Sequence, residues 1–394
     1  MSYRKTREIT WKLAAVSSVL FFAAYAAVAQ TQSTRRAEER TATQLTEIAR
    51  DAIEAENDVL VNGDVNRSLS RRPLASLHRN GIAQRLENSL RRNKALTAQK
   101  IGYKSHKTQV TVNDVKIEGD KAVMTATEYV ILALEPVPDG PDQTEYVQDH
   151  VMEFVKEGNQ WRLVSDSVPP PPPLPEPATV PIFVPPLEEA PPNFIPEARQ
   201  QAIRSGNNSP WLKASYVASS APMYGSYNGT AAAVYAYAYW GPSNSNYNTL
   251  QYRTYGNDCT NFTSQTLKYA GWPYDSNGSR TANDTWYYGT FSSTTSYSWA
   301  GANNFLLFFY YYSGGRGYIA RYFSELSRGD ILQADWGPSP DGTINHSMVV
   351  TKKDSYGRLY LTYHTNNTKD KPLADIQAAN PGTNYYGEKM YSSF

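Results

Sequence analysis

A proline-rich segment divides the chain into two parts and limits what each part can fold into. Residues 169–196 read PPPPPLPEPATVPIFVPPLEEAPPNFIP and hold 13 of the chain's 25 prolines. Proline fixes φ and removes a backbone hydrogen-bond donor, so this stretch favours polyproline II, which at about 3.1 Å per residue reaches on the order of 90 Å. We therefore expect two folded regions, at residues 38–168 and 198–394, separated by a semi-rigid spacer at residues 169–197. An ordinary linker and a docking sequence for a proline-binding module are the alternatives.

The N-terminus has the pattern of an export signal. Leu13 to Val28 form an apolar stretch of the right length for a signal peptide and short for a membrane span, and Ala27-Val28-Ala29 supplies a cleavage site. A basic segment precedes the apolar stretch, with charges at Arg4, Lys5, Arg7 and Lys12. The pattern predicts a signal peptide at residues 1–29, or else an uncleaved signal anchor. Either places the rest of the chain outside the cytoplasm, and cleavage would leave it without a membrane attachment.

Residues 38–168 have the pattern of an α+β domain. Helical periodicity comes first, followed by short alternating runs separated by turns at Glu118-Gly119-Asp120 and Glu157-Gly158-Asn159. Helices followed by a strand meander indicate an α+β fold. The element order resembles the cone-shaped cystatin and nuclear-transport-factor type. No catalytic motif is visible here, and we interpret His78, His106 and His150 as surface residues.

Charge and aromatic content restrict the class of partner. The formal net charge of +1 argues against nucleic acid or an anionic surface as the main partner. Of the 30 tyrosines, 25 lie from residue 210 onward, in a region that is also rich in Asn, Ser, Gly and Thr. This composition suits a polar, aromatic-lined groove for sugars or peptides, although many secreted domains share it.

Cys259 is the only cysteine in the chain, which is unusual for an exported protein because disulfides need pairs. An unpaired cysteine forms an intermolecular bond, serves as a reactive thiol or is buried and inert. The segment DCTNFTSQTLKYAG predicts a helix that begins at Cys259, with Asp258 as N-cap and Gly271 just past the end. The first turn of a helix favours a thiolate and offers N–H groups to an oxyanion. The position therefore favours the reactive thiol.

Two histidines lie at mirrored ends of a predicted hairpin. DILQADW, HSMVVTKK and RLYLTYH are predicted strands, and a turn at Asp354-Ser355-Tyr356-Gly357 joins the last two. One register places His346 opposite Asn366 with His364 diagonal to it, and another places His346 directly opposite His364. A register shifted by one residue would put His364 on the other face. The hairpin thus offers His364 or Asn366 as a partner of His346.

Four sequence blocks together resemble a known family. YAYAYWGPSNSNY, NDCTNFTSQTL, GDILQADW and NHSMVVT…YLTYHTNN, within residues 225–394, resemble the putative amidase domain of secreted Gram-positive bacterial proteins. They are more distantly similar to NlpC-type and CHAP cell-wall peptidases. The resemblance implies a papain-like α+β hydrolase domain at residues 198–394, with Cys259 as nucleophile, His346 as base and His364 as the residue that orients the base.

The resemblance also implies a substrate and a location. We expect a secreted or cell-wall-associated enzyme that hydrolyses amide bonds of a cell-wall peptide or glycopeptide, with no cofactor and no metal. An acyltransferase with the same Cys–His site and a non-catalytic cell-wall binding module are the alternatives. The oligomeric state is not indicated. Further hypotheses are an oxyanion role for Tyr255 or Asn257 and a substrate groove that contains Trp286, Trp299 and Trp336.

Overall fold

The computed structural model describes residues 35–70, 79–169, 184–204, 225–241, 247–337 and 340–394. The expected signal peptide and residues 170–183 of the proline-rich spacer lie outside these ranges. Within them, no helix is long and apolar enough to cross a lipid bilayer. The protein is of the mixed α+β class, as the sequence predicts, with a large antiparallel sheet.

The N-terminal region packs helices against an antiparallel meander. A helix over residues 35–62 comes first. The elements that follow are α2 (Val65–Ser70), α3 (Arg79–Ala98), β1 (Tyr103–Glu118), β2 (Lys121–Leu134), β3 (Gln143–Glu157) and β4 (Gln160–Ser167). Gly119 and Gly158 have φ of 62° and 61°, a left-handed conformation that glycine adopts without strain. Both predicted hairpin turns are therefore confirmed.

One apolar core joins these helices to one face of the meander. Ile53 of the first helix and Leu86 of α3 pack with Met124, Phe154 and Leu163 of the strands. Because β2 alternates buried and less buried side chains, only one of its faces contributes to this core.

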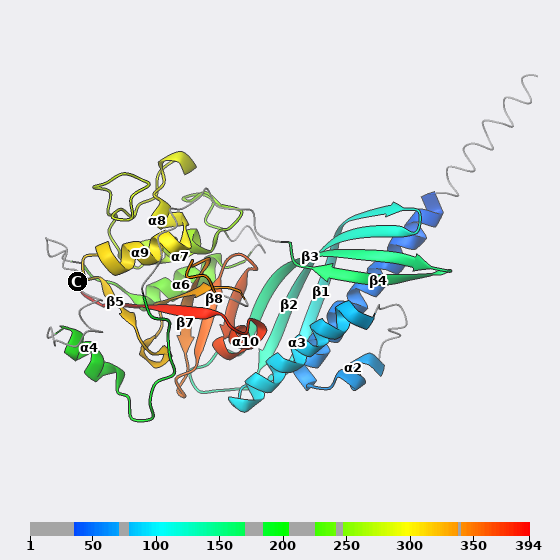
Figure 1. Cartoon of the computed structure of the whole chain (residues 1–394), viewed down its shortest axis with the longest axis horizontal. Coiled ribbons are helices and arrows are strands. Elements are labelled where there is room, and N and C mark those ends of the chain that lie inside the picture. Colours follow the sequence, from blue (N-terminus) through cyan, green and yellow to red (C-terminus); the bar gives the residue numbers. More distant parts are fainter. Residues whose placement is uncertain (1–34, 71–78, 170–183, 205–224, 242–246, 338–339) are drawn as a thin grey trace, which may run out of the picture.

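The C-terminal region continues the sheet and covers it with helices. Its helical elements are α4 (Pro196–Arg204), α6 (Gly229–Tyr239), α7 (Cys259–Tyr269), η2 (Ser292–Thr294), α8 (Tyr297–Ala300), α9 (Ala302–Tyr312), η3 (Phe323–Glu325) and α10 (Leu373–Ala379). Its strands are β5 (Gly317–Ala320), β6 (Ile331–Asp335), β7 (His346–Lys353), β8 (Leu359–Tyr363), β9 (Thr368–Pro372) and β10 (Asn384–Met390). Figure 1 shows α7, α8 and α9 at the opposite end of the molecule from β4.

The two regions share a single sheet. Within the described ranges the strand order is β1-β2-β3-β9-β8-β7-β6-β10-β5, with β4 paired to β3. The junction is short, with Glu145 opposite Lys369 and Tyr146 opposite Thr368. A fully extended, semi-rigid spacer would hold the two regions apart, whereas an ordinary linker, the alternative, would not. The pairing of β3 with β9 instead brings the regions into direct contact.

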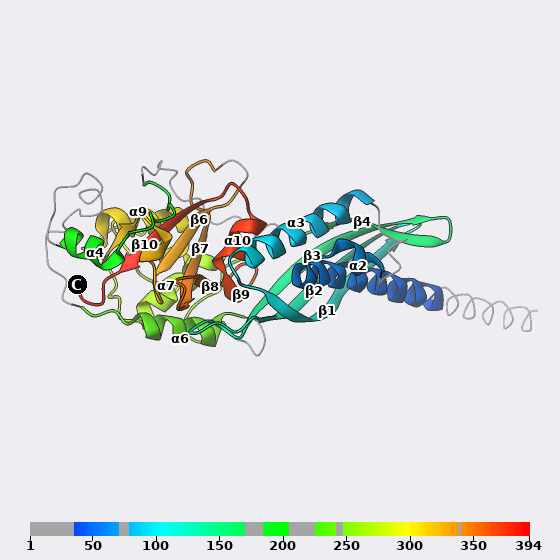
Figure 2. The same ribbon diagram turned by 90° about the horizontal axis from the view of Figure 1, so that it is seen from below.

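A buried ion pair reinforces this junction. Arg92 of α3 donates to both carboxylate oxygens of Asp375 in α10, at 2.6 and 3.0 Å, and Tyr103 donates to the same carboxylate at 2.9 Å. Figure 2 shows α3 running along the N-terminal sheet to meet α10. Burial alone would raise the pKa of Asp375, but the charges of Arg92 and Lys371 outweigh it and lower the pKa to about 2. The carboxylate is thus ionised at neutral pH.

His150 is not a surface residue. Its Nδ1 lies 2.9 Å from Asp166 and its Nε2 lies 3.2 Å from Glu128, and all three side chains are almost fully buried. Burial alone would lower the pKa of His150, but the two carboxylates raise it to about 9. The sequence could not reveal this network because its members come from three different strands.

Replacing Asp375 with Asn should lower the free energy of unfolding by about 3–5 kcal/mol, because Arg92 would remain buried without an anion. Urea unfolding followed by tryptophan fluorescence would measure the loss. Glu188→Gln is the matched control, since it breaks the exposed Arg321–Glu188 pair and should cost less than about 1 kcal/mol. Equal losses in the two variants would contradict a special role for the Asp375 junction.

Candidate active site

Cys259 is the first residue of α7, as the sequence predicts. Gly271 lies just past the helix end with φ of 117°. Asp258 occupies the N-cap position, but its side chain does not cap the helix. One carboxylate oxygen accepts from the backbone N–H of Tyr255 at 2.8 Å and from the Asn261 side chain at 2.9 Å. Asp258 therefore orders the loop that leads into the nucleophile.

The thiol of Cys259 is buried and protonated. Only 1% of the residue is exposed, and Sγ–H donates to Asn257 Oδ1 at 3.2 Å. Burial raises the pKa of the thiol to about 11, although hydrogen bonds from the Thr260 side chain and the Ser347 backbone act in the opposite direction. The expectation of a helix-stabilised thiolate is thus wrong for the free protein, because the loss of hydration outweighs the helix dipole.

His346 is the first residue of β7 and is also buried. Its ring lies 5.2 Å from the Trp336 ring and 5.0 Å from the Tyr363 ring, measured between centroids. Its Nε2 has no hydrogen-bond partner within the described part of the chain. Burial lowers the pKa of His346 to about 3, so the ring is neutral at pH 7 and able to accept a proton. No hydrogen bond between this ring and Cys259 is present among the described residues.

Two hydroxyl residues connect the helix start at Cys259 to the strand start at His346. Thr260, next to Cys259, lies 2.9 Å from Ser347, next to His346, measured between the side-chain oxygens. Gln333 of β6 donates to the same Ser347 oxygen at 2.7 Å. These contacts fix the start of α7 against the start of β7. Neither hydroxyl residue was among the candidates predicted from the sequence, although each directly follows a predicted catalytic residue.

His364 does not orient His346, because the hairpin register shifts within β7. Lys352 is opposite Tyr360, but beyond a bulge Val350 is opposite Leu361 and Val349 is opposite Thr362. A shift of one residue moves every later side chain to the other face of the sheet. The structure thus has the register that is shifted by one residue, which puts His364 on the opposite face of the sheet from His346.

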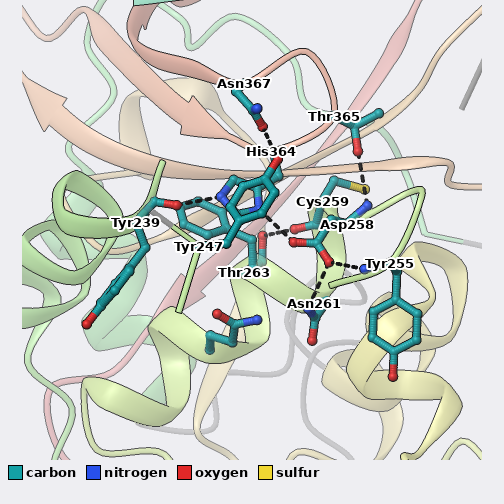
Figure 3. Close-up of polar contacts among 12 residues, drawn as sticks. Tyr239, Tyr247, Tyr255, Asp258, Cys259, Asn261, Thr263, His364, Thr365 and Asn367 are labelled. Carbon is teal, nitrogen blue, oxygen red and sulfur yellow. Dashed lines mark hydrogen bonds and ion pairs between the residues drawn. The ribbon is translucent and has the colours of Figure 1, made fainter. Parts of the chain in front are cut away.

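His364 instead contacts Asp258, the residue directly before Cys259. Figure 3 shows its ring between Asp258 and the backbone of Tyr239, and the distances are 2.6 Å from Nδ1 to Asp258 Oδ2 and 2.6 Å from Nε2 to Tyr239 O. The ring also stacks on Phe262 of α7, at 4.0 Å between centroids. Both ring nitrogens are therefore occupied, and His364 positions the loop and the first turn of α7.

The remaining polar candidates, Asn366, Asn257 and Tyr255, lie in different surroundings. Asn366 lines the same cavity as His346, with φ of 64°, but no hydrogen bond joins their side chains in the described structure. Asn257 also lines this cavity, yet its oxygen rather than its amide nitrogen faces the thiol. In Figure 3 the Tyr255 ring points away from Cys259, so the predicted oxyanion role of its hydroxyl is not supported.

The three tryptophans separate into two groups. Trp286 and Trp299 are completely buried in the core and cannot line a groove. They brace α7 instead, through hydrogen bonds from Trp286 to Ser264 at 3.0 Å and from Trp299 to Asn261 at 2.7 Å. Trp336 lines the cavity beside His346.

A cavity of about 630 Å³ lies between the two regions and reaches His346. The N-terminal region supplies Glu56, Asn57, Arg85, Asn88, Ser89, Arg92, Glu128, Tyr146, Gln148 and Val168. The C-terminal region supplies Asn257, Trp336, Asn345, His346, Tyr363, Thr365, Asn366, Thr368, Lys371, Ile376, Ala379 and Asn380. Three or more His, Cys, Asp or Glu side chains arranged to hold a metal ion are not found among the described residues.

Comparison with known proteins supports an amidase role. Residues 226–387, which include Cys259, His346 and His364, match the family model of the putative amidase domain. Uncharacterized protein YhbB of Bacillus subtilis (strain 168) is 25% identical over 291 residues, covering 70% of this chain and 78% of that protein. The family match supports a general role as a hydrolase of C–N bonds.

Two solved structures are similar to part of the chain. The Kfla4162 protein from Kribbella flavida is 17% identical, with 32% of this chain and 90% of that chain covered and a TM-score of 0.24. The intermembrane space region of chloroplast protein ARC6 is 16% identical, with 33% and 94% covered and a TM-score of 0.24. Likenesses at this TM-score do not establish a shared fold.

Native Cys259 should react with iodoacetamide about 100-fold more slowly at pH 8 than it does in the urea-unfolded chain. A pKa of about 11 in place of the ordinary 9.0 leaves about 100-fold less thiolate at that pH. Mass spectrometry of the single alkylated thiol gives both rates. Glutathione, with and without urea, controls for the denaturant, and a native rate equal to the unfolded rate would contradict the buried neutral thiol.

Folding stability should fall on acidification because His346 is buried in its neutral form. The folded-state pKa lies below the ordinary value of 6.5, so this stability is present above pH 6.5 and is lost as pH falls toward about 3. Relative to His346→Asn, the wild type should lose about 4 kcal/mol between pH 7 and pH 3. Urea unfolding across this range measures the difference.

His150 is the internal comparison with the opposite sign. Its pKa is raised to about 9, so the advantage of the wild type over His150→Asn should disappear as pH rises from 6.5 through about 9. A difference between the wild type and His346→Asn that does not depend on pH would show that His346 is solvated.

Proposed function

We propose that the protein is an exported cysteine-dependent amidase that cleaves cell-wall peptides through an acyl-enzyme on Cys259. The observation that supports this best is the buried, unpartnered Nε2 of His346, on a cavity wall that the Thr260–Ser347 contact fixes against the nucleophile. An unpartnered buried nitrogen is costly, and catalytic sites are where such costs are retained. The family match over residues 226–387 agrees with this chemistry.

The proposed reaction begins with both groups neutral. As Cys259 Sγ bonds to the amide carbonyl carbon, its proton passes to His346 Nε2. The carbonyl oxygen becomes an oxyanion, stabilised by backbone N–H groups at the start of α7. The His346 imidazolium then protonates the leaving nitrogen as the C–N bond breaks. Water, deprotonated by His346, finally hydrolyses the thioester and releases a carboxylate and the free thiol.

Two features of the site support this order of events. Asn257 lies on the cavity wall and accepts a hydrogen bond from the thiol, and in this proposal its side chain turns aside when a carbonyl carbon approaches Sγ. Trp336 and Tyr363 hold the imidazole ring from two sides, which compensates for the missing polar partner. In this proposal His364 acts as a positioning residue.

The finer assignments belong to the same proposal. They are a papain-like arrangement of the C-terminal region, a cystatin or nuclear-transport-factor type of N-terminal region, and export by the signal at residues 1–29. The helix-borne cysteine followed by a strand-borne histidine supports the papain-like assignment.

Cys259→Ala and Cys259→Ser should each abolish release of peptide fragments from purified peptidoglycan, with a loss of at least about 10³-fold because no acyl-enzyme can form. His346→Ala should show a comparable loss. Mass spectrometry of the soluble products measures the activity and identifies the bond. Since the chain has one thiol, complete alkylation of Cys259 in the wild type provides an independent test. Lys104→Gln, at an exposed lysine outside the cavity, is the control.

Activity that survives both Cys259 substitutions would rule out cysteine catalysis. The same assay with an added amine distinguishes hydrolysis from acyl transfer: a hydrolase releases free acids in both mixtures, whereas a transferase yields the new amide.

A further inference from the structure

We propose that the cavity between the two regions is the substrate site and that Lys371, together with Arg92, receives a carboxylate of the substrate there. The enzyme would then select anionic peptides, with the N-terminal region forming part of the specificity site. This inference rests on the proposed amidase function and names the substrate class for it.

Arg92 and Lys371 both lie close to the carboxylate of Asp375. Asp375 already accepts two hydrogen bonds from Arg92 and one from Tyr103. Lys371 Nζ lies 3.8 Å from the same carboxylate, which is close enough for charge attraction but too far for a hydrogen bond. Arg92 and Lys371 line the cavity, and Asp375 lies behind them. Among these three side chains, two positive charges thus share one negative charge.

Lys371 is held in place, but no neighbouring carboxylate forms a hydrogen bond with its charged Nζ in the described structure. Its Nζ lies 5.3 Å from the centre of the Tyr146 ring, which lines the cavity from the N-terminal region. Burial and the nearby charge of Arg92 lower the pKa of Lys371 to about 8, although the charges of Asp375 and Glu128 act in the opposite direction. A ligand carboxylate would supply the missing counter-charge and a charge-assisted hydrogen bond.

The carboxylates on the cavity wall are already engaged. Glu128 accepts from Asn57 at 2.8 Å and contacts His150 at 3.2 Å. Glu56 forms an ion pair with Arg85. Glu128 acts on Lys371 through its charge, but no carboxylate accepts a hydrogen bond from Lys371 Nζ among the described residues.

The proposed carboxylate site and the reacting groups share one wall. Tyr363 contacts the His346 ring at 5.0 Å between centroids, and the charges of Asp375 and Arg92 act on its hydroxyl. Tyr363 ends β8, and Lys371 lies on the adjacent strand β9. The volume of about 630 Å³ is within the range of sites for small ligands and accommodates a short peptide. A peptide bound here would place an amide near His346 and a carboxylate near Lys371.

The test compares synthetic cell-wall stem peptides that differ only in charge. One peptide keeps its carboxylates, and three others have the C-terminal carboxylate, the side-chain carboxylate or both converted to carboxamides. We expect the wild type to prefer the acid over the full carboxamide by about 10- to 100-fold in kcat/KM, the worth of one charge-assisted hydrogen bond. The single conversions identify which carboxylate is bound.

Matched variants assign this preference to Lys371. The ratio of kcat/KM for acid to carboxamide should fall to about 1 in Lys371→Met and persist in Lys371→Arg and Lys104→Gln. Because the ratio compares two substrates on one preparation, it does not depend on the folded fraction of a variant. A wild type without preference, or a preference retained by Lys371→Met, would overturn the inference.

Calorimetry with Cys259→Ala separates this inference from the proposed function. If the wild type cleaves no peptide but Cys259→Ala binds the acid more tightly than the carboxamide, the proposed function fails and the carboxylate site stands. The additional substitution Lys371→Met should then remove the difference in Kd. If no peptide is cleaved and none binds at millimolar concentration, the inference is overturned as well.

Discussion

The pairing of β3 with β9 is the constraint on which the arrangement of the site depends. Only two residue pairs cross this junction in register, Glu145 with Lys369 and Tyr146 with Thr368. So short a pairing is weak by itself, and the Arg92–Asp375 ion pair and a shared apolar cluster around Tyr103 and Tyr360 reinforce it. Desolvating an ion pair is costly, so this one is better understood as fixing the relative position of the regions than as a source of net stability. Because the junction is fixed, residues of both regions meet around one cavity.

Burial determines the protonation states of Cys259 and of His346, which lines that cavity. A helix N-terminus favours a thiolate by a few tenths to about 1 kcal/mol, whereas removing a charged group from water costs several kcal/mol. Cys259 and His346 are therefore both neutral in the free protein, and ionisation of either group alone would be unfavourable because the charge would be buried. In the proposed reaction, proton transfer from thiol to imidazole creates a thiolate and an imidazolium whose mutual attraction offsets part of this cost. Such a transfer fits a site that becomes reactive when a substrate enters and displaces Asn257 from the sulfur.

Sequence patterns predicted the local structure well and the long-range contacts poorly. The turns at Gly119 and Gly158 and the helix that begins at Cys259 depend on neighbouring residues, so the sequence contains their signals. The bulge within β7 has no comparable signal, yet it decides the face on which His364 lies. Trp286 and Trp299 show the same limit, because aromatic residues suit a groove and a core equally well until burial is known. Asp375 pairs with Arg92 and Tyr103, which lie more than 270 positions earlier in the chain, so neither segment alone predicts these contacts.

The division of the cavity separates the reaction from the choice of substrate. The amidase match begins at residue 226 and ends at residue 387, so it covers Cys259, His346 and Lys371 but none of the N-terminal wall. Changes at Asn57, Asn88 or Gln148 would alter what the cavity accepts without touching the contact between Thr260 and Ser347. If the two proposals hold, the chemistry depends on residues of one region, whereas selectivity depends on both regions and on their fixed junction.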